Sequence, residues 1–138
     1  MTARTLVRLL AVVTMVVVGT TCGDTVDPVD NTPTPGWVAV RLTSPNADDG
    51  GMLFTVGGAA IDSVRSSFPD RYFRKESATS WRVLIGGSLA TGSAVAEIFV
   101  PDTRTLAGYS ATILQVAQRV PPFGQRLVTG YGVTIGTP

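Results

Sequence analysis

Residues 37–57 read WVAVRLTSPNADDGGMLFTVG, and this stretch decides the fold class. Val38, Val40 and Leu42 alternate with other residues, which is the period-two pattern of a β-strand with one buried face. A turn-rich segment follows, and residues 52–57 then alternate in the same way. Two alternating runs separated by turn residues predict two β-strands.

The same rhythm continues to the end of the chain. Short runs rich in Val, Ile, Thr, Phe and Tyr lie between Gly, Pro, Asp and Ser, as in an all-β sandwich or barrel. The charged run at 72–75 suits an edge strand. Seven or eight strands in about 100 residues favour an immunoglobulin-like β-sandwich. Beyond the first two, the predicted strands are residues 61–65, 72–75, 81–86, 94–100, 109–120 and 126–135.

Residues 109–120 fit two patterns. Ile113, Val116 and Ala117 follow helical spacing, whereas Leu114 and Val116 alternate as in a strand. We predict a strand, because YSATIL is rich in aromatic and β-branched residues and two adjacent prolines end the segment.

The N-terminus has the composition of an export signal. Arg4 and Arg8 precede an uncharged, mostly aliphatic run at residues 9–18, which is the order of a basic region and a hydrophobic region. As a helix, this run would span roughly 15 Å at about 1.5 Å per residue. That is about half of a hydrocarbon core near 30 Å thick, so a permanent transmembrane helix is not expected. Residues 1–21 are therefore predicted to be a signal peptide.

The only cysteine of the chain, Cys22, follows three small residues. Val18-Gly19-Thr20-Thr21-Cys22 resembles the lipobox of bacterial lipoproteins. The resemblance implies cleavage before Cys22, acylation by two or three chains, and anchoring to the bacterial cell membrane or outer membrane. Stable attachment needs more than one acyl chain. The alternative is an ordinary secretory signal peptide with an incidental cysteine.

After the signal, the chain is predicted to form a tether and one domain. Residues 22–35 contain the lipidated cysteine and a stretch rich in Asp and Pro, which cannot bury enough apolar area to fold. Residues 36–138 have the size of a single domain. Basic and acidic residues nearly balance, which argues against a nucleic-acid partner.

Two segments of this domain carry a resemblance of their own. The domain is similar to cohesin-type and carbohydrate-binding β-sandwiches in these two segments. One is GGMLFTV, and the other is the strand–turn–strand segment that begins at Trp81 and has GSLATGS as its turn. The resemblance implies a sandwich and no particular ligand.

Side chains for catalysis are few. The chain has no histidine, which excludes a His-based triad. Lys75, the only lysine, is predicted to be a solvated charge, because a lysine base needs burial to lower its pKa. Glu97 is predicted to pair with an arginine on a neighbouring strand. The alternative, a carboxylate-based hydrolase, would rely on Glu97, Asp102 or Asp62. We predict neither an enzyme nor a cofactor.

Candidate binding residues are the aromatic side chains Trp37, Tyr72 and Tyr131. An exposed Trp can stack on a sugar ring or fill a pocket of a partner, although Trp37 could equally cover the junction of tether and domain. Asp48 and Asp49 could donate oxygens to calcium, which takes six to eight such ligands. Two adjacent Asp followed by glycines more often form a turn.

Together these features predict a non-catalytic, lipid-anchored binding module of the bacterial cell envelope, with an envelope protein or a glycan as its partner. The alternative is a structural or assembly accessory of an envelope complex. A hydrolase would require two carboxylates about 5 to 10 Å apart in a cleft.

Overall fold

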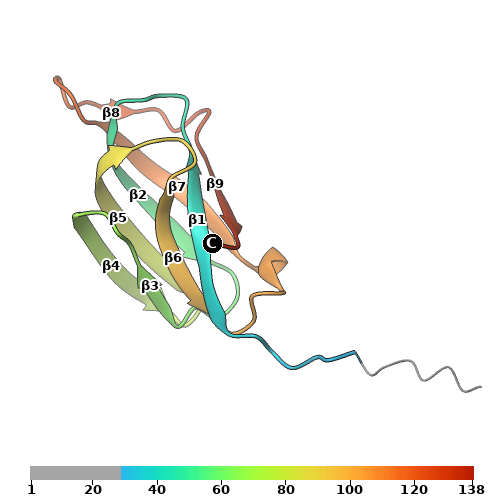
Figure 1. The fold of residues 1–138 in the computed structure, drawn as a ribbon. Helices are drawn as coiled ribbons and strands as arrows, with labels where there is room; N and C mark the ends of the chain where they lie inside the picture. Colours follow the sequence, from blue (N-terminus) through green and yellow to red (C-terminus); the bar gives the residue numbers. More distant parts are fainter. Residues whose placement is uncertain (1–28) are drawn as a thin grey trace, which may run out of the picture. The chain divides into compact units, whose positions relative to one another are not determined.

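The computed structural model describes residues 29–138, so the predicted signal peptide, Cys22 and the first part of the predicted tether lie outside the described residues. Within the described range, residues 32–138 form one compact unit of β-strands, shown in Figure 1. No helix among residues 29–138 is long and apolar enough to cross a bilayer.

Nine strands and one short 3₁₀ helix follow one another in the described part of the chain. They form two antiparallel sheets, one with the order β3-β6-β1-β9 and the other with the order β4-β5-β2-β7-β8. The predicted all-β, two-sheet fold is therefore confirmed, with nine strands in place of seven or eight. The elements are β1 (Gly36–Thr43), β2 (Asp49–Gly57), β3 (Ser63–Arg65), β4 (Asp70–Ser77), β5 (Ser80–Leu89), β6 (Ala94–Val100), η1 (Leu106–Gly108), β7 (Ser110–Gln118), β8 (Gln125–Arg126) and β9 (Gly132–Gly136).

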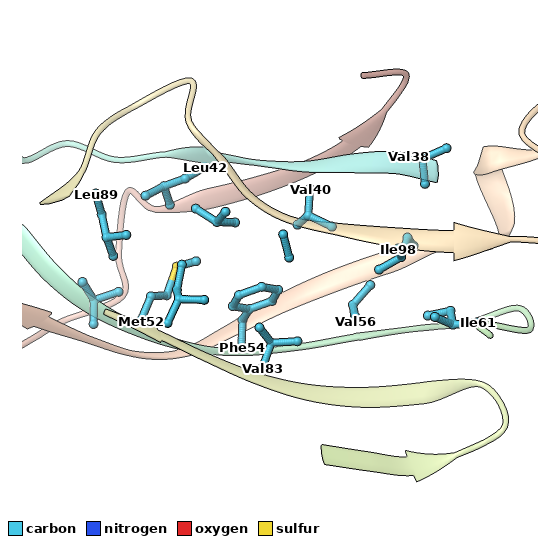
Figure 2. Packing of buried hydrophobic residues seen from close by; sticks show 14 of the residues in the cluster. Val38, Val40, Leu42, Met52, Phe54, Val56, Ile61, Val83, Leu89 and Ile98 are labelled. Carbon is cyan, nitrogen blue, oxygen red and sulfur yellow. The ribbon is translucent and has the colours of Figure 1, made fainter. Parts of the chain in front are cut away.

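The core lies between the inner faces of the two sheets, as Figure 2 shows. Val38 and Val40 of β1 and Phe54 of β2 are fully buried there, in the phase that the alternation predicts. Every buried hydrophobic residue of the described chain lies between Val38 and Val116. The unit from residue 32 onward thus contains a complete core of its own.

The segment predicted as one final strand, residues 126–135, is two strands, so that prediction is wrong. β8 belongs to the five-stranded sheet and β9 to the four-stranded sheet. Between them, Gly130 has a φ of +83°, which glycine adopts without the steric cost of a side chain. The N–H of Tyr131 donates to the carbonyl of Val128 at 3.2 Å and closes a turn. The chain crosses here from one sheet to the other.

The ambiguous segment 109–120 forms β7, which confirms the predicted strand. Its double pattern has a physical cause in the register with β2. Phe54 pairs with Ile113 and Leu53 with Gln115, so Leu114 is an extra residue at a bulge. The bulge changes the spacing of inward residues, which produced the partial helical signal.

Residues just before the predicted boundary between residues 35 and 36 form hydrogen bonds with the domain. The N–H of Thr34 donates to Oδ1 of Asp102 at 3.3 Å, and the carbonyl of Thr34 accepts from the N–H of Thr103 at 2.8 Å. The guanidinium of Arg104 donates to the carbonyl of Thr32. These bonds form a clamp that ties residues 32–34 to the loop after β6.

Candidate functional site

An apolar row crosses the outer face of the five-stranded sheet. Residues that pair directly across neighbouring strands point to the same face of a sheet. Tyr72 of β4 pairs with Leu84 of β5, and Leu84 pairs with Leu53 of β2. Leu53 in turn pairs with Gln115 of β7. Tyr72 is 61% exposed and Leu84 is 47% exposed, so this row faces solvent.

A second row, on the same face, consists mainly of small residues. Gly86 and Gly51 lie at its centre, and the hollows over this part of the sheet share Gly51. The hollow between Tyr72 and Gly86 has a volume of about 520 Å³ and is open to solvent. We call this surface, from Tyr72 to Phe123, the outer-face groove. The row in order is Asp70, Gly86, Gly51, Ala117 and Gln125.

Phe123 forms the wall of the groove at the end opposite Tyr72. It is 64% exposed and has a φ of 57°, a backbone conformation that is costly for a bulky residue. Its N–H donates to the carbonyl of Val120 at 2.9 Å, and the carbonyl of Gly124 accepts from the N–H of Gln118 at 3.0 Å. These bonds close the loop between β7 and β8 and hold the ring beside the groove.

A charged row borders the apolar row on its other side. Arg74 of β4 pairs with Arg82 of β5, and Glu76 binds both, at 2.8 Å and 2.9 Å. The hydrogen bond from Arg74 lowers the pKa of Glu76, and the nearby charge of Arg82 adds to this effect. The carboxylate between two guanidinium groups keeps the arginines in place along the rim.

The three predicted binding residues lie in different parts of the domain. Tyr72 is in the outer-face groove. Trp37 lies on the outer face of the four-stranded sheet, where the guanidinium of Arg65 covers its ring. Tyr131 is half-buried beside β9, and its hydroxyl donates to Asp49 at 2.9 Å. Burial and this hydrogen bond raise the pKa of Tyr131. The structure therefore does not assemble the three rings into one site.

Asp48 and Asp49, the calcium candidates, are both bound to an arginine. Asp49 is fully buried, and its carboxylate lies 2.9 Å from Nε of Arg126 and accepts from the Ser44 hydroxyl. Asp48 also forms an ion pair with Arg126. The arginine supplies the positive charge that a cation would bring. Among residues 29–138, no group of three or more His, Cys, Asp or Glu side chains could hold a metal ion.

Two of the candidate catalytic carboxylates, Glu97 and Asp102, also have structural partners. Glu97 pairs with Arg65 of the neighbouring strand β3, which confirms the predicted pairing. Asp102 accepts from Nε of Arg104 at 3.0 Å and forms part of the clamp. The negative charges of Asp62 and Asp102 raise the pKa of Tyr109, after the larger effect of its burial. Glu97 lies within β6, whereas Asp62 and Asp102 lie in the loops before β3 and after β6. None of the three lines the groove.

Sequence reasoning missed most of the groove. The alternation of β5 contained a usable signal, since Leu84 lies between the buried Val83 and Ile85 and must therefore face outward. Gly51 and Phe123 gave no such signal, because their positions depend on strand register and on a loop. No family model, curated protein or solved structure gives a significant match to the chain.

Proposed function

We propose that this protein is a non-catalytic, lipid-anchored binding module of the bacterial cell envelope that docks a protein partner in its outer-face groove. The observation that carries this proposal is the row of Tyr72, Leu84 and Leu53 on a sheet face, in which Tyr72 and Leu84 are exposed and Leu53 is half-buried. We also propose that the domain is of the immunoglobulin-like type, which nine short strands in two antiparallel sheets support.

The chemistry of the groove favours a protein partner. Leu84 and Leu53 occupy the centre, and arginines bound to Glu76 form the rim. An apolar centre within a polar rim is typical of protein–protein interfaces, in which Tyr and Arg often dominate the binding energy. Leucine side chains bury well against apolar side chains of another protein.

A glycan is the second candidate, because Tyr72 and Phe123 place an exposed ring at each end of the groove. Sugar rings stack on aromatic faces. The glycines between the rings of Tyr72 and Phe123 leave the sheet backbone accessible to a flat glycan chain.

The anchor is tested at Cys22. We expect the wild-type protein to fractionate with membranes and the Cys22→Ser variant to leave them, because the thiol is the predicted point of acylation. Intact-mass measurement of the processed wild-type protein should show an acylated cysteine as its first residue. A Cys22→Ser protein that stays on membranes after a salt wash would contradict lipid anchoring.

The groove is tested by comparing two leucine variants of the full protein after chemical crosslinking on cells. Leu84→Glu places a charge in the groove, whereas Leu127→Glu makes the same change at a residue that is 85% exposed and does not line it. We expect Leu84→Glu to lose a crosslinked protein that both wild type and Leu127→Glu retain. The same crosslinked protein on Leu84→Glu would exclude the groove as the docking site.

The second candidate is tested on a glycan array. Binding of the wild-type protein to the array that is lost with Tyr72→Ala would favour a glycan as the partner.

A further inference from the structure

Strand β4 is the longest of the edge strands in the described chain. It has eight residues, whereas the other edge strands β3, β9 and β8 have three, five and two. Figure 1 shows it at the border of the five-stranded sheet, where β5 is its only paired strand. All its residues except Phe73 are exposed. A free edge of this kind presents unpaired backbone N–H and C=O groups to another extended chain.

One side of β4 carries an apolar residue between two cations. Arg71, Phe73 and Lys75 share the side that faces the sandwich interior, since each pairs with an inward-phase residue of β5. The guanidinium of Arg71 donates to the carbonyl of Phe68 at 2.7 Å, and the ammonium of Lys75 lies 5.5 Å from the ring centroid of Trp81. Within residues 29–138, neither cation forms an ion pair.

We propose that β4 binds an extended acidic peptide segment as an added strand. Main-chain hydrogen bonds would supply the affinity of such an addition, and side chains at alternate positions would supply the specificity. The complementary segment has an apolar residue opposite Phe73 and a carboxylate two residues away on each side. Because this pattern is symmetric, it fits either strand direction.

The same charges disfavour a second copy of this chain as the occupant. If two β4 strands paired antiparallel about Phe73, Arg71 of each copy would lie opposite Lys75 of the other. Like charges directly opposite each other destabilise a strand pair, and lysine on an edge strand deters edge-to-edge association. The register with β5 shifts between Lys75 and Ser77, which ends the regular part of the edge. The edge is thus suited to a short acidic segment from another protein.

This inference does not depend on the lipid anchor or on the outer-face groove. The edge uses the backbone of β4 and the interior-facing side of that strand, whereas Tyr72 of the groove points to the opposite face. A failure of the Leu84→Glu comparison would therefore leave the edge proposal standing, and the reverse also holds.

The test measures fluorescence anisotropy of a labelled synthetic peptide with the full-length protein in detergent. In the test peptide, valine is flanked at alternate positions by two glutamates, with threonine at the intervening positions. The matched peptide has lysines in place of the glutamates. Two further copies of the test peptide are N-methylated on alternate backbone amides, one copy in each phase.

The protein variants reverse the same amount of charge in two places. Arg71→Glu combined with Lys75→Glu changes the proposed edge, whereas Arg41→Glu combined with Arg65→Glu changes two arginines of the four-stranded sheet, on β1 and β3. We expect the first variant to weaken binding of the glutamate peptide by about tenfold, because two attractive cross-strand pairs become repulsive. We expect the control variant to bind like wild type.

The N-methylated peptides separate strand addition from simple charge attraction. Only one phase of amides in an added strand points toward β4, so one methylated copy should lose binding and the other should retain it. Equal binding by both copies would overturn the proposal. So would equal weakening by the two protein variants, or no binding of the glutamate peptide to wild type. In the last case the charges of β4 serve only to keep the edge unpaired.

Discussion

The guanidinium of Arg65 lies over the indole ring of Trp37, 4.0 Å from the ring centroid. The ring of Phe99 meets the same indole edge-on, with the two centroids 5.3 Å apart. Glu97 holds Arg65 in place through an ion pair. One face of Trp37 is therefore covered by a side chain of its own domain, and the indole belongs to a packed cluster on the four-stranded sheet.

We predict that Arg65→Ala lowers the free energy of unfolding by about 1 kcal/mol, because it removes a cation–π contact and an exposed ion pair. Urea denaturation followed by tryptophan fluorescence measures this change. Arg41→Ala is the control, since Arg41 makes no aromatic contact and its loss should cost less than about 0.5 kcal/mol. Equal losses in the two variants would show that the contact with Trp37 does not stabilise the domain.

Removal of the buried carboxylate of Asp49 is predicted to cause a larger loss in the free energy of unfolding. Asp49→Ala leaves the Tyr131 hydroxyl without its acceptor and leaves the Ser44 hydroxyl with only the carbonyl of Asn46. It also removes one partner of Arg126, whose side chain is only 18% exposed. We expect a loss of about 3 kcal/mol in the free energy of unfolding, because the change unpairs buried polar groups and leaves only the more exposed Asp48 to neutralise Arg126.

The matched control for Asp49 is Asp48→Ala. Asp48 pairs with the same arginine but its side chain is 40% exposed. We expect it to cost about 1 kcal/mol or less, as exposed ion pairs do. If Asp48→Ala proved as destabilising as Asp49→Ala, the depth of burial would not explain the difference in their roles.

The strands that line the core could be predicted from the sequence, because burial of one face imposes a period of two on the apolar residues. Val38 and Phe54 follow this period and lie in the core as expected. The period fails at bulges and crossings. Leu114 is an extra residue in β7, and the turn at Gly130 divides the predicted last strand.

The candidate site could be predicted only in part, because it depends on contacts between residues that are distant in the sequence. Tyr72 is a candidate binding residue from the sequence alone, and it lines the groove. The hollow at Gly51 requires the registers of β2 with both β5 and β7, which local patterns do not contain. The cover of Arg65 on Trp37 likewise depends on how β3, β6 and β1 align.

Substitutions at two adjacent glycines of the groove are predicted to change the free energy of unfolding in opposite directions. A Cβ at Gly51 would lie 3.7 Å from the carbonyl oxygen of Ile85 and 3.9 Å from Cβ of Ala117, which are ordinary contacts. A Cβ at Gly50 would lie 2.5 Å from Cα of Arg119, which is too close.

We therefore expect Gly51→Ala to raise the free energy of unfolding by about 0.5 kcal/mol, since alanine loses less backbone entropy than glycine on folding. We expect Gly50→Ala to lower it by about 1–3 kcal/mol, as overpacking does. Thermal denaturation of both variants measures the two changes. A loss of stability in Gly51→Ala would show that the floor of the groove has no room for a methyl group.

The clamp between Thr34 and Asp102 predicts a dependence on pH. Hydrogen bonds from the side chain and backbone of Arg104, with a further one from Thr34, lower the pKa of the Asp102 carboxyl from 3.8 to about 2. Because the folded-state pKa is below the unfolded value, the carboxylate stabilises the clamp fully above pH 3.8. This contribution is lost as the pH falls through about 2.

Nuclear magnetic resonance of the Thr34 amide proton measures this transition directly, since that N–H donates to the carboxylate. We expect its chemical shift to stay constant from neutral pH down to pH 3.8 and to change with a midpoint of about 2. In Asp102→Asn, which cannot ionise, the shift should show no such midpoint, and exchange of the Thr34 and Thr103 amides with solvent should be faster at neutral pH. A wild-type midpoint at the unperturbed pKa of 3.8 would mean that Arg104 and Thr34 do not hold the carboxylate in solution. The tether would then join the domain at residue 36, as the composition alone suggests.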